Sequence, residues 1–112
     1  MRHRLVLLLV LAVSAVLTAG CGSAFSSKPV ATNQVLLPKS YRFDPMEVVV
    51  KAGTSVTWSN HDNFTHTVKV EDGVDHKISP GQSVTIKFPT LGTYRYVCTL
   101  HSHDMHGVVI VK

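Results

Sequence analysis

The chain has 112 residues, of which 45% are hydrophobic and 16% charged, and its formal net charge is +4 at pH 7. Arg2 and Arg4 account for two of the eleven basic residues, and the rest of the chain has nine Lys or Arg against seven Asp or Glu, without a basic cluster. This balance argues against nucleic-acid binding. The length is sufficient for one small domain.

The amino terminus has the pattern of an export signal. Two arginines precede an apolar run, Leu5–Leu17, in which Ser14 is the only polar residue, and small residues precede Cys21. A positive flank, a short apolar run and small residues at the end are typical of secretory signals. A membrane-spanning helix needs roughly 20 apolar residues, so this run is too short to be one. We therefore predict that residues 1–20 are a signal peptide.

The segment Leu17-Thr18-Ala19-Gly20-Cys21 resembles the cleavage box of bacterial lipoproteins, with Thr18 at a position where leucine is more common. In such proteins a lipid is attached to the cysteine and the signal is then removed. The resemblance implies that Cys21 is lipidated; ordinary signal cleavage, with Cys21 as a spare thiol, is the alternative. A lipid would anchor the chain to a membrane surface without spanning it. We expect a location at the outer face of the cytoplasmic membrane or in the periplasm.

Residues 21–34 follow the signal and have the composition of a linker. They are rich in Ser, Ala, Lys, Pro and Asn and show little hydrophobic periodicity, which predicts a flexible tether. Residues 35–112 then form a single domain near the lower size limit for a self-sufficient core. A bound metal ion would help to stabilise such a domain.

Residues 35–112 have the pattern of a β-protein. Apolar and polar residues alternate between Gly, Pro, Asn and Asp positions, without helical periodicity. The alternation is clearest in Ser83–Phe88, where Val84, Ile86 and Phe88 share one face. The predicted strands are 34–37, 40–43, 47–51, 55–59, 66–71, 83–88, 93–98 and 108–112. So many short strands predict an all-β fold, a Greek-key β-sandwich of seven or eight strands.

The last predicted hairpin contains residues whose side chains can bind a metal ion. Cys98 ends one strand, His101 and Met105 follow in a short loop, and the next strand begins at Val108. Because Cys21 belongs to the processing site, Cys98 has no evident disulfide partner, and a metal ion is one reason for an unpaired thiol in an exported domain. Thiolate and thioether sulfur favour Cu(I), and two imidazoles, one thiolate and a weak axial Met form the blue-copper ligand set.

A second histidine ligand must come from another part of the chain. His66 is the best candidate, because it begins a predicted strand after a polar loop, and a sandwich can bring that point to the same end as Cys98. The expected ligand set is therefore His66, Cys98, His101 and Met105.

Three sequence patterns are similar to those of the cupredoxins, most of all their plastocyanin and amicyanin branch. They are Val-Thr-Trp-Ser-Asn at 56–60, His-Thr-Val at 66–68, and Tyr-x-Tyr-x-Cys-x-x-His at 94–101, followed by Met and Gly. The resemblance covers the domain from about Tyr41 to the end. It implies a sandwich that binds one type 1 copper and transfers single electrons. Three residues separate His101 from Met105, so the loop is intermediate between the two of amicyanin-like and the four of plastocyanin-like members.

Other histidines offer alternative ligands. His103 competes with His101, since azurin-like relatives have a more distant loop histidine, but Met105 would then be too close in sequence to reach over the metal. His106 is a minor alternative as the axial ligand. His61 and His76 are expected to be exposed loop residues.

Two threonines directly follow two predicted ligands. Thr67 follows His66, and Thr99 follows Cys98. Ligands are usually held by hydrogen bonds from the residues around them, so we expect these threonines to tie the two ligand segments together.

The predicted copper site indicates an electron-transfer protein rather than an enzyme. Multicopper oxidases and nitrite reductases need further copper ligands, a second domain and histidines beside the cysteine, whereas Val97 and Thr99 adjoin Cys98. A zinc site is disfavoured because Met is a poor zinc ligand. The alternative function is copper storage or delivery to a membrane cuproenzyme. We expect a monomer with redox proteins as partners and the membrane surface in contact through its lipid anchor.

Overall fold

The computed structural model describes residues 28–112, which form nine β-strands and no helix. The strands are β1 (Val30–Ala31), β2 (Gln34–Leu37), β3 (Glu47–Val50), β4 (Thr54–Asn60), β5 (His66–Val70), β6 (Asp75–Ile78), β7 (Ser83–Phe88), β8 (Gly92–Val97) and β9 (His106–Val111). Over that range no helix is long and apolar enough to cross a membrane. The predicted signal peptide and the lipidation of Cys21 lie outside the described residues and stay predictions.

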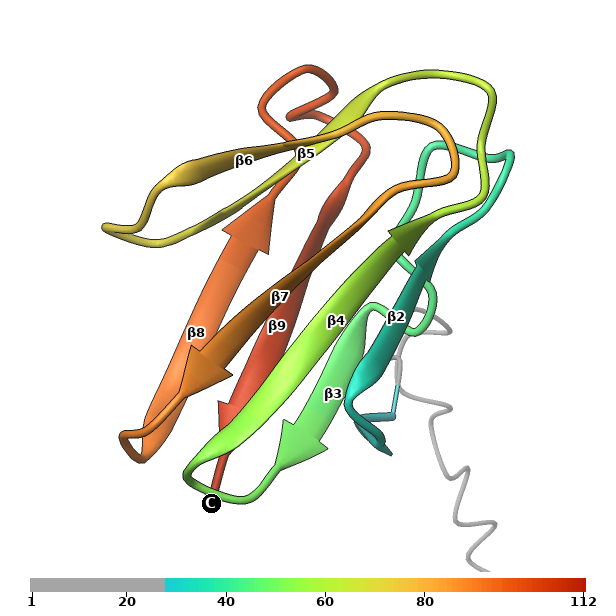
Figure 1. Cartoon of the computed structure of the whole chain (residues 1–112). Helices are drawn as coiled ribbons and strands as arrows, with labels where there is room; N and C mark the ends of the chain where they lie inside the picture. The colour runs from blue at the N-terminus through green and yellow to red at the C-terminus, as the bar shows by residue number, and fades with distance from the viewer. Residues whose placement is uncertain (1–27) are drawn as a thin grey trace, which may run out of the picture.

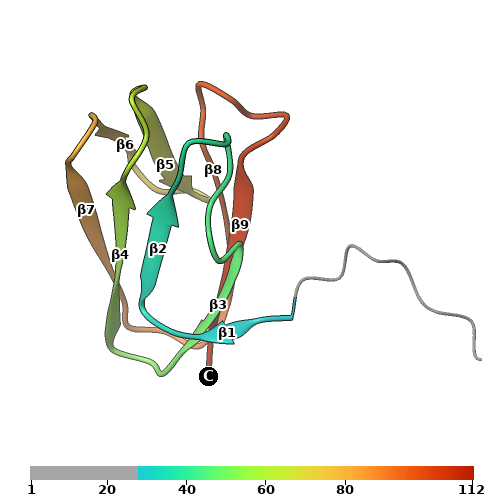
Figure 2. The ribbon, with the colours of Figure 1, turned by 90° about the vertical axis from the view of Figure 1, so that its right-hand side faces the viewer.

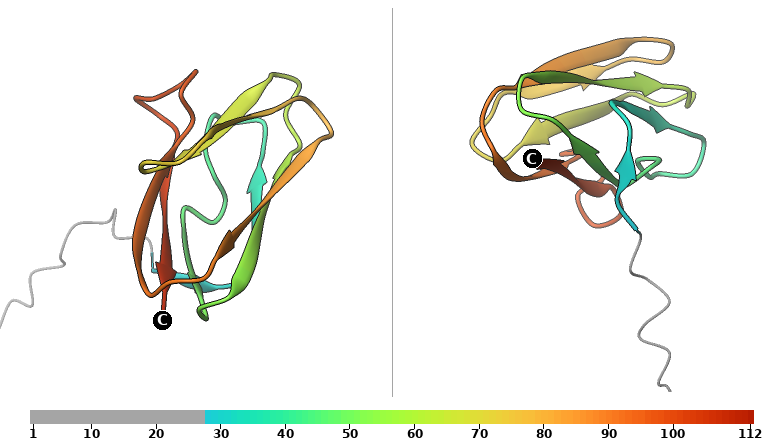
Figure 3. Two further views of the ribbon diagram at one scale, coloured as in Figure 1. Left: turned by 60° about the vertical axis from the view of Figure 1, so that its left-hand side comes forward. Right: turned by 90° about the horizontal axis from the view of Figure 1, so that it is seen from below.

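The strands form two sheets that pack face to face (Figures 1 and 3). One sheet has the order β1-β3-β9-β8-β5-β6, and the other has the order β2-β4-β7. Only the β5–β6 and β8–β9 connections join neighbours in one sheet; the others carry the chain between the sheets. The predicted all-β sandwich is confirmed, with nine strands in residues 28–112 instead of the seven or eight expected.

The core lies between the two sheets and follows from the alternation in the strands. In β4, Val56 and Trp58 are fully buried, while Thr57 and Ser59 lie on the opposite face. The Trp58 ring contacts the Tyr96 ring of the other sheet edge-on, with centroids 5.2 Å apart. Burial of these large apolar side chains is the main source of stability in a domain without helices.

Three segments differ from the predicted secondary structure. Residues 40–43 form a turn and an irregular stretch instead of a strand, and Tyr41 adopts a positive φ of 50°. β1 lies inside the predicted tether and pairs in parallel with β3. Both of its residues are exposed, so the sequence shows no apolar alternation that would predict this strand. β6 was missed because three of its four residues are polar, and it contains His76, which was expected in a loop.

One end of the sandwich brings distant segments together. The β2–β3, β4–β5 and β8–β9 loops all lie at the end opposite the C terminus (Figure 2). The β5–β8 pairing, Lys69 with Val97 and Val70 with Tyr96, directs the first residue of β5 toward the loop that follows β8. The predicted ligand segments therefore meet at this end.

Gly107 allows β9 to pass close to its neighbours. A Cβ atom there would collide with the Met46 carbonyl oxygen and with the Tyr96 ring. The Tyr96 hydroxyl instead donates a hydrogen bond to that carbonyl, at 3.1 Å. The glycine thus lets the strand that follows the ligand loop pack directly against the core.

Candidate metal centre

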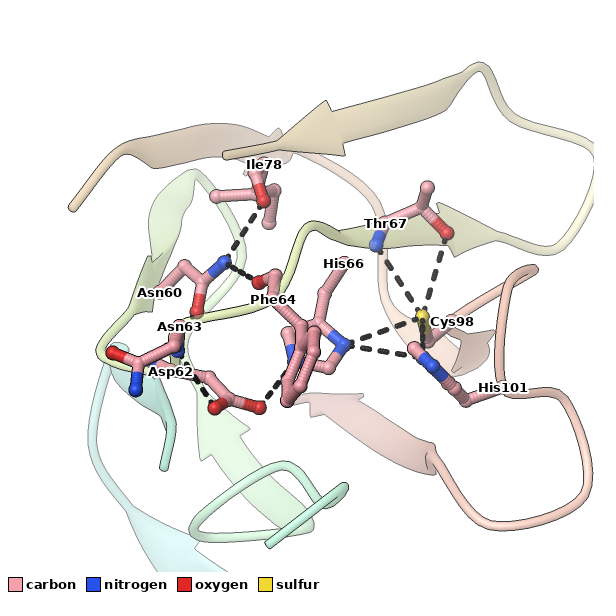
Figure 4. Close-up of polar contacts among 9 residues, drawn as sticks. All are labelled: Asn60, Asp62, Asn63, Phe64, His66, Thr67, Ile78, Cys98 and His101. Carbon is pink, nitrogen blue, oxygen red and sulfur yellow. Dashed lines mark hydrogen bonds and ion pairs between the residues drawn. The ribbon is translucent and has the colours of Figure 1, made fainter. Parts of the chain in front are cut away.

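The side chains of His66, Cys98 and His101 converge on one point (Figure 4). The Nδ1 atoms of the two histidines are 3.2 Å apart, and the Cys98 Sγ atom lies 3.9 Å from His66 Nδ1 and 3.5 Å from His101 Nδ1. A point about 2.1 Å from all three atoms lies inside this triangle, which is a metal–imidazole bond length and slightly short for a metal–thiolate bond. Within residues 28–112 no other group of three His, Cys, Asp or Glu side chains converges in this way.

A buried carboxylate fixes the orientation of His66. The ring of His66 is fully buried, and its Nε2 atom donates a hydrogen bond to Asp62 Oδ2 at 2.8 Å. This bond leaves the Nδ1 lone pair directed at the Cys98 sulfur and at His101. The same hydrogen bond holds the pKa of Asp62 below its ordinary value, so the carboxylate is ionised at neutral pH.

Asn60 holds the β4–β5 loop that carries Asp62 and His66. Its side-chain amide donates to the carbonyl oxygens of Phe64, at 2.8 Å, and Ile78, at 2.9 Å. Its Oδ1 atom accepts the Asp62 N–H at 2.8 Å. Figure 4 shows these bonds on the side of His66 that faces away from Cys98. Because Asn60 is buried and its amide is well satisfied, the loop is held in one conformation.

Asn60 and Asp62 were not among the predicted site residues. Asn60 continues the buried alternation of Val56 and Trp58 in β4, and a polar residue on an inward face is a signal that could have identified it. Asp62 lies in an irregular loop, where no periodicity indicates which way a side chain points.

The Cys98 sulfur accepts hydrogen bonds from Thr67 on β5, the strand that begins at His66. The backbone N–H of Thr67 donates to Sγ at 3.3 Å, and the Thr67 Oγ1 atom lies 3.8 Å from Sγ. The Cys98 N–H in turn donates to the Met105 carbonyl oxygen at 2.9 Å, which closes the ligand loop.

Thr67 and Thr99 connect the two ligand segments, as predicted. The Thr99 N–H donates to Thr67 Oγ1 at 2.7 Å, and the two hydroxyl oxygens are 2.8 Å apart. The Thr99 hydroxyl also donates to Asp75 Oδ2 at 2.8 Å. These bonds keep His66 and Cys98 at a fixed separation although they are 32 residues apart in sequence.

The β8–β9 loop presents His101 and Met105. The amide N–H groups of Asp104 and Met105 donate to the His101 carbonyl oxygen at 3.1 Å and 3.0 Å. The His101 ring is partly exposed and makes an edge-to-face contact with the Tyr41 ring, with centroids 4.8 Å apart. The Met105 side chain is fully buried, and its role as axial ligand stays a prediction.

The other histidines in residues 28–112 lie outside the donor cluster. His103 is exposed, so His101 rather than His103 faces Cys98. His106 is exposed at the start of β9, and its Nε2 atom donates to the His103 carbonyl oxygen at 3.1 Å. His61 is exposed, and His76 is half-buried in β6.

Comparisons with known sequences point to one family. The profile of the cupredoxin-like domain matches residues 5–111. Amicyanin-alpha of Methylorubrum extorquens is 35% identical over 106 residues, which cover 88% of this chain and 87% of the relative. A chloroplastic plastocyanin of Tetradesmus obliquus is 40% identical over 84 residues, which cover 62% of this chain and 58% of the relative.

Solved structures have the same fold. A mutant of amicyanin in its reduced state superimposes with a TM-score of 0.66 and 28% identity, covering 78% of this chain and 87% of that one. A purple cupredoxin from Nitrosopumilus maritimus superimposes with a TM-score of 0.63 and 23% identity, covering 70% and 98% of the two chains, and supports the fold alone.

Proposed function

This chain belongs to the family of cupredoxin-like domains, and we propose that it is a blue-copper protein that carries single electrons outside the cytoplasmic membrane. His66, Cys98 and His101 would hold one type 1 copper, with Met105 as the fourth ligand. The observation that carries this proposal is the convergence of two imidazole nitrogens and one sulfur at one end of the sandwich. Bound copper supplies reversible one-electron chemistry between Cu(I) and Cu(II).

The donor set favours copper over other metals. Zinc accepts imidazole and thiolate, but a thioether is a poor zinc ligand. Iron–sulfur clusters need several cysteines, and Cys98 is the only cysteine in the part of the chain that the structure describes. A site with one thiolate, two imidazoles and an adjacent buried methionine fits copper, which alternates between soft Cu(I) and borderline Cu(II).

The surrounding residues hold the donors in place independently of a metal. Asp62 fixes the ring of His66, and the hydrogen bonds between Thr67 and Thr99 fix the spacing between the two ligand segments. A preorganised set of donors changes little between two oxidation states, and this lowers the reorganisation that electron transfer requires.

His101 provides the route for electrons. His66 and Cys98 are fully buried, whereas the His101 ring is partly exposed at the end of the sandwich. Leu100, beside it, is 58% exposed. A redox partner that docks on this end approaches the donor cluster through the His101 ring. The proposed activity is therefore electron transfer between proteins, without catalysis of a chemical reaction.

We further propose that the chain is exported, and that it is either anchored by a lipid on Cys21 at the outer face of the cytoplasmic membrane or located in the periplasm or cell envelope. The support is the signal-like segment and the cleavage box around Cys21. Mass spectrometry of the membrane fraction should find a mature chain that begins at Cys21 and carries a diacylglycerol adduct. A Cys21→Ser variant should lose the adduct; an unmodified wild-type Cys21 would contradict the anchor.

Copper delivery is the alternative function, and copper retention separates the two. The purified domain, loaded with copper, is reduced and reoxidised stepwise in the presence of a Cu(I) chelator while the visible spectrum is recorded. An electron carrier returns to its initial absorbance over repeated cycles, because its enclosed donors retain the metal in both states. Transfer of the copper to the chelator on the first reduction would support delivery and contradict the proposed electron carrier.

A further inference from the structure

We propose that Asp75 is a positioning residue of the metal centre: its carboxylate sets the direction in which two threonine hydroxyls donate, and so keeps the reduction potential of the copper site low. The inference rests on the proposed function. Asp75 is the first residue of β6, is exposed and does not belong to the donor cluster.

A line of polar contacts connects this carboxylate to the buried sulfur. Asp75 Oδ2 lies 2.8 Å from Thr99 Oγ1, which lies 2.8 Å from Thr67 Oγ1. Thr67 Oγ1 lies 3.8 Å from the Cys98 Sγ atom. Three separate segments, β5, β6 and the β8–β9 loop, thus contribute to one short chain of hydroxyl groups between the surface and the thiolate.

The carboxylate determines where each hydroxyl hydrogen points. An ionised carboxylate only accepts hydrogen bonds, and each threonine has a single hydroxyl hydrogen. The Thr99 hydrogen therefore points to Asp75, and Thr99 Oγ1 is left as an acceptor. The Thr67 hydrogen points to Thr99 Oγ1 at 2.8 Å instead of the sulfur at 3.8 Å. The sulfur then receives the Thr67 N–H at 3.3 Å without competition from the hydroxyl.

Loss of the carboxylate reverses this arrangement. Without Asp75, the Thr99 hydroxyl is free to donate to Thr67 Oγ1, and the Thr67 hydrogen turns to the Cys98 sulfur. Reduction adds negative charge to the site, so a second donor on sulfur stabilises the reduced state and raises the potential. Removal of a nearby negative charge acts in the same direction. Two contributions, orientation and charge, must therefore be separated.

The test measures reduction potentials by spectroelectrochemistry in five copper-loaded variants beside the wild type. Asp75→Asn removes the charge but retains an oxygen that can accept from Thr99. Asp75→Ala removes the charge and the acceptor. Thr99→Val retains the charge but removes the hydroxyl between Asp75 and Thr67. Asp72→Asn, in the same β5–β6 turn, is the matched control, because the structure gives its side chain no bond to either threonine.

We expect the potential to rise in the order wild type and Asp72→Asn, then Asp75→Asn, then Asp75→Ala. Thr99→Val should also raise it, and the thiolate absorption band of Thr99→Val and Asp75→Ala should move to shorter wavelength, because an added donor lowers the energy of the sulfur electrons. Thr99→Ser restores the hydroxyl and should restore the wild-type potential.

Three results would overturn the inference. Equal shifts in Asp75→Asn and Asp75→Ala, with no shift in Thr99→Val, would leave charge as the sole effect of Asp75. An unchanged reduction potential in all variants would show that Asp75 has no role in setting it, while the proposed function would stand. A wild-type protein without a reversible potential would refute the proposed function and this inference together.

Discussion

His66 and His101 face the same sulfur from two regions that differ in burial and in support. His66 begins a strand, is 0% exposed, and donates its Nε2–H to Asp62 Oδ2. His101 lies on a loop and is partly exposed, and in the described part of the chain the hydrogen-bond contacts of its ring involve Nδ1 alone. The His101 ring also makes an edge-to-face contact with the Tyr41 ring.

The difference assigns separate tasks to the two regions. The β4–β5 side, which we call the anchored side, comprises Asn60, Asp62 and His66 and fixes the geometry of the centre. The β8–β9 side, which we call the open side, comprises His101 with Tyr41 packed against it and connects the centre to solvent. The better-supported side is the buried one, and the accessible side is the one through which the proposed redox partner would approach.

Removal of each imidazole in turn should give the largest contrast between the two sides. Both His66→Gly and His101→Gly should lose the intense visible band of the copper protein. Free imidazole at millimolar concentration should restore the band in His101→Gly, because the vacated position is open to solvent, and should fail in His66→Gly, where it is enclosed. Absorption spectra recorded during an imidazole titration measure this. Equal recovery in both variants would refute the contrast.

Asn60→Ala should weaken the anchored side strongly. It leaves the Phe64 and Ile78 carbonyls and the Asp62 N–H without their partner. Buried groups left unpaired cost about 1–3 kcal/mol each, with partial relaxation, so we expect about 2–4 kcal/mol less stability. Urea unfolding of the metal-free protein measures it. Asn63→Ala, at an exposed position of the same loop, should cost below about 0.5 kcal/mol; similar losses in both variants would contradict the role of Asn60.

Asp62→Ala should reduce copper affinity with a smaller effect on folding. The ring of His66 loses its fixed acceptor, and loss of such a partner typically lowers metal affinity about 10- to 100-fold. Competition with a chelator of known affinity measures the change. Asp104→Ala, on the open side, is the control: the structure gives that side chain no bond to His101, and its backbone N–H remains. An equal loss in the control would contradict the assignment.

Tyr41→Ala should have the smallest effect and should act on the open side. Edge-to-face contacts of this kind contribute about 0.5–1.5 kcal/mol, and the Tyr41 and His101 rings are 4.8 Å apart. We expect copper to transfer to a chelator about two- to tenfold faster, as measured by stopped-flow absorbance. Phe64→Leu, which removes the ring stacked on Tyr41 at 6.0 Å, should change the rate less. No change in Tyr41→Ala would show that its contact does not hold His101.

The sequence predicted the residues that follow periodic or motif rules. The alternation in β7 predicted which side chains face the core, where Phe88 is buried and Val84 and Ile86 are partly buried. The spacing of Cys98 and His101 on one hairpin predicted two donors of the cluster. His66 was found because a strand start after a polar loop leads to the same end of a sandwich. The Thr67–Thr99 bridge followed from their positions beside the ligands.

The residues that sequence reasoning missed act through irregular structure or mostly polar strands. Asp62 reaches His66 from a loop whose conformation depends on the buried amide of Asn60. Tyr41 reaches His101 because its turn has a positive φ, which its residue type does not indicate. Asp75 lies on β6, whose polar residues show no apolar alternation. Such contacts depend on tertiary packing, which local patterns do not encode.

The central claim is that Cys98, together with the two histidines, binds one copper ion through its thiolate. Addition of Cu(II) to the purified domain, followed by visible and electron-spin resonance spectra of the wild type and of Cys98→Ser, tests it most directly. The account predicts one bound copper and an intense band at about 600 nm in the wild type, absent from the variant. A wild-type protein without that band, or a variant that retains it, would contradict the claim.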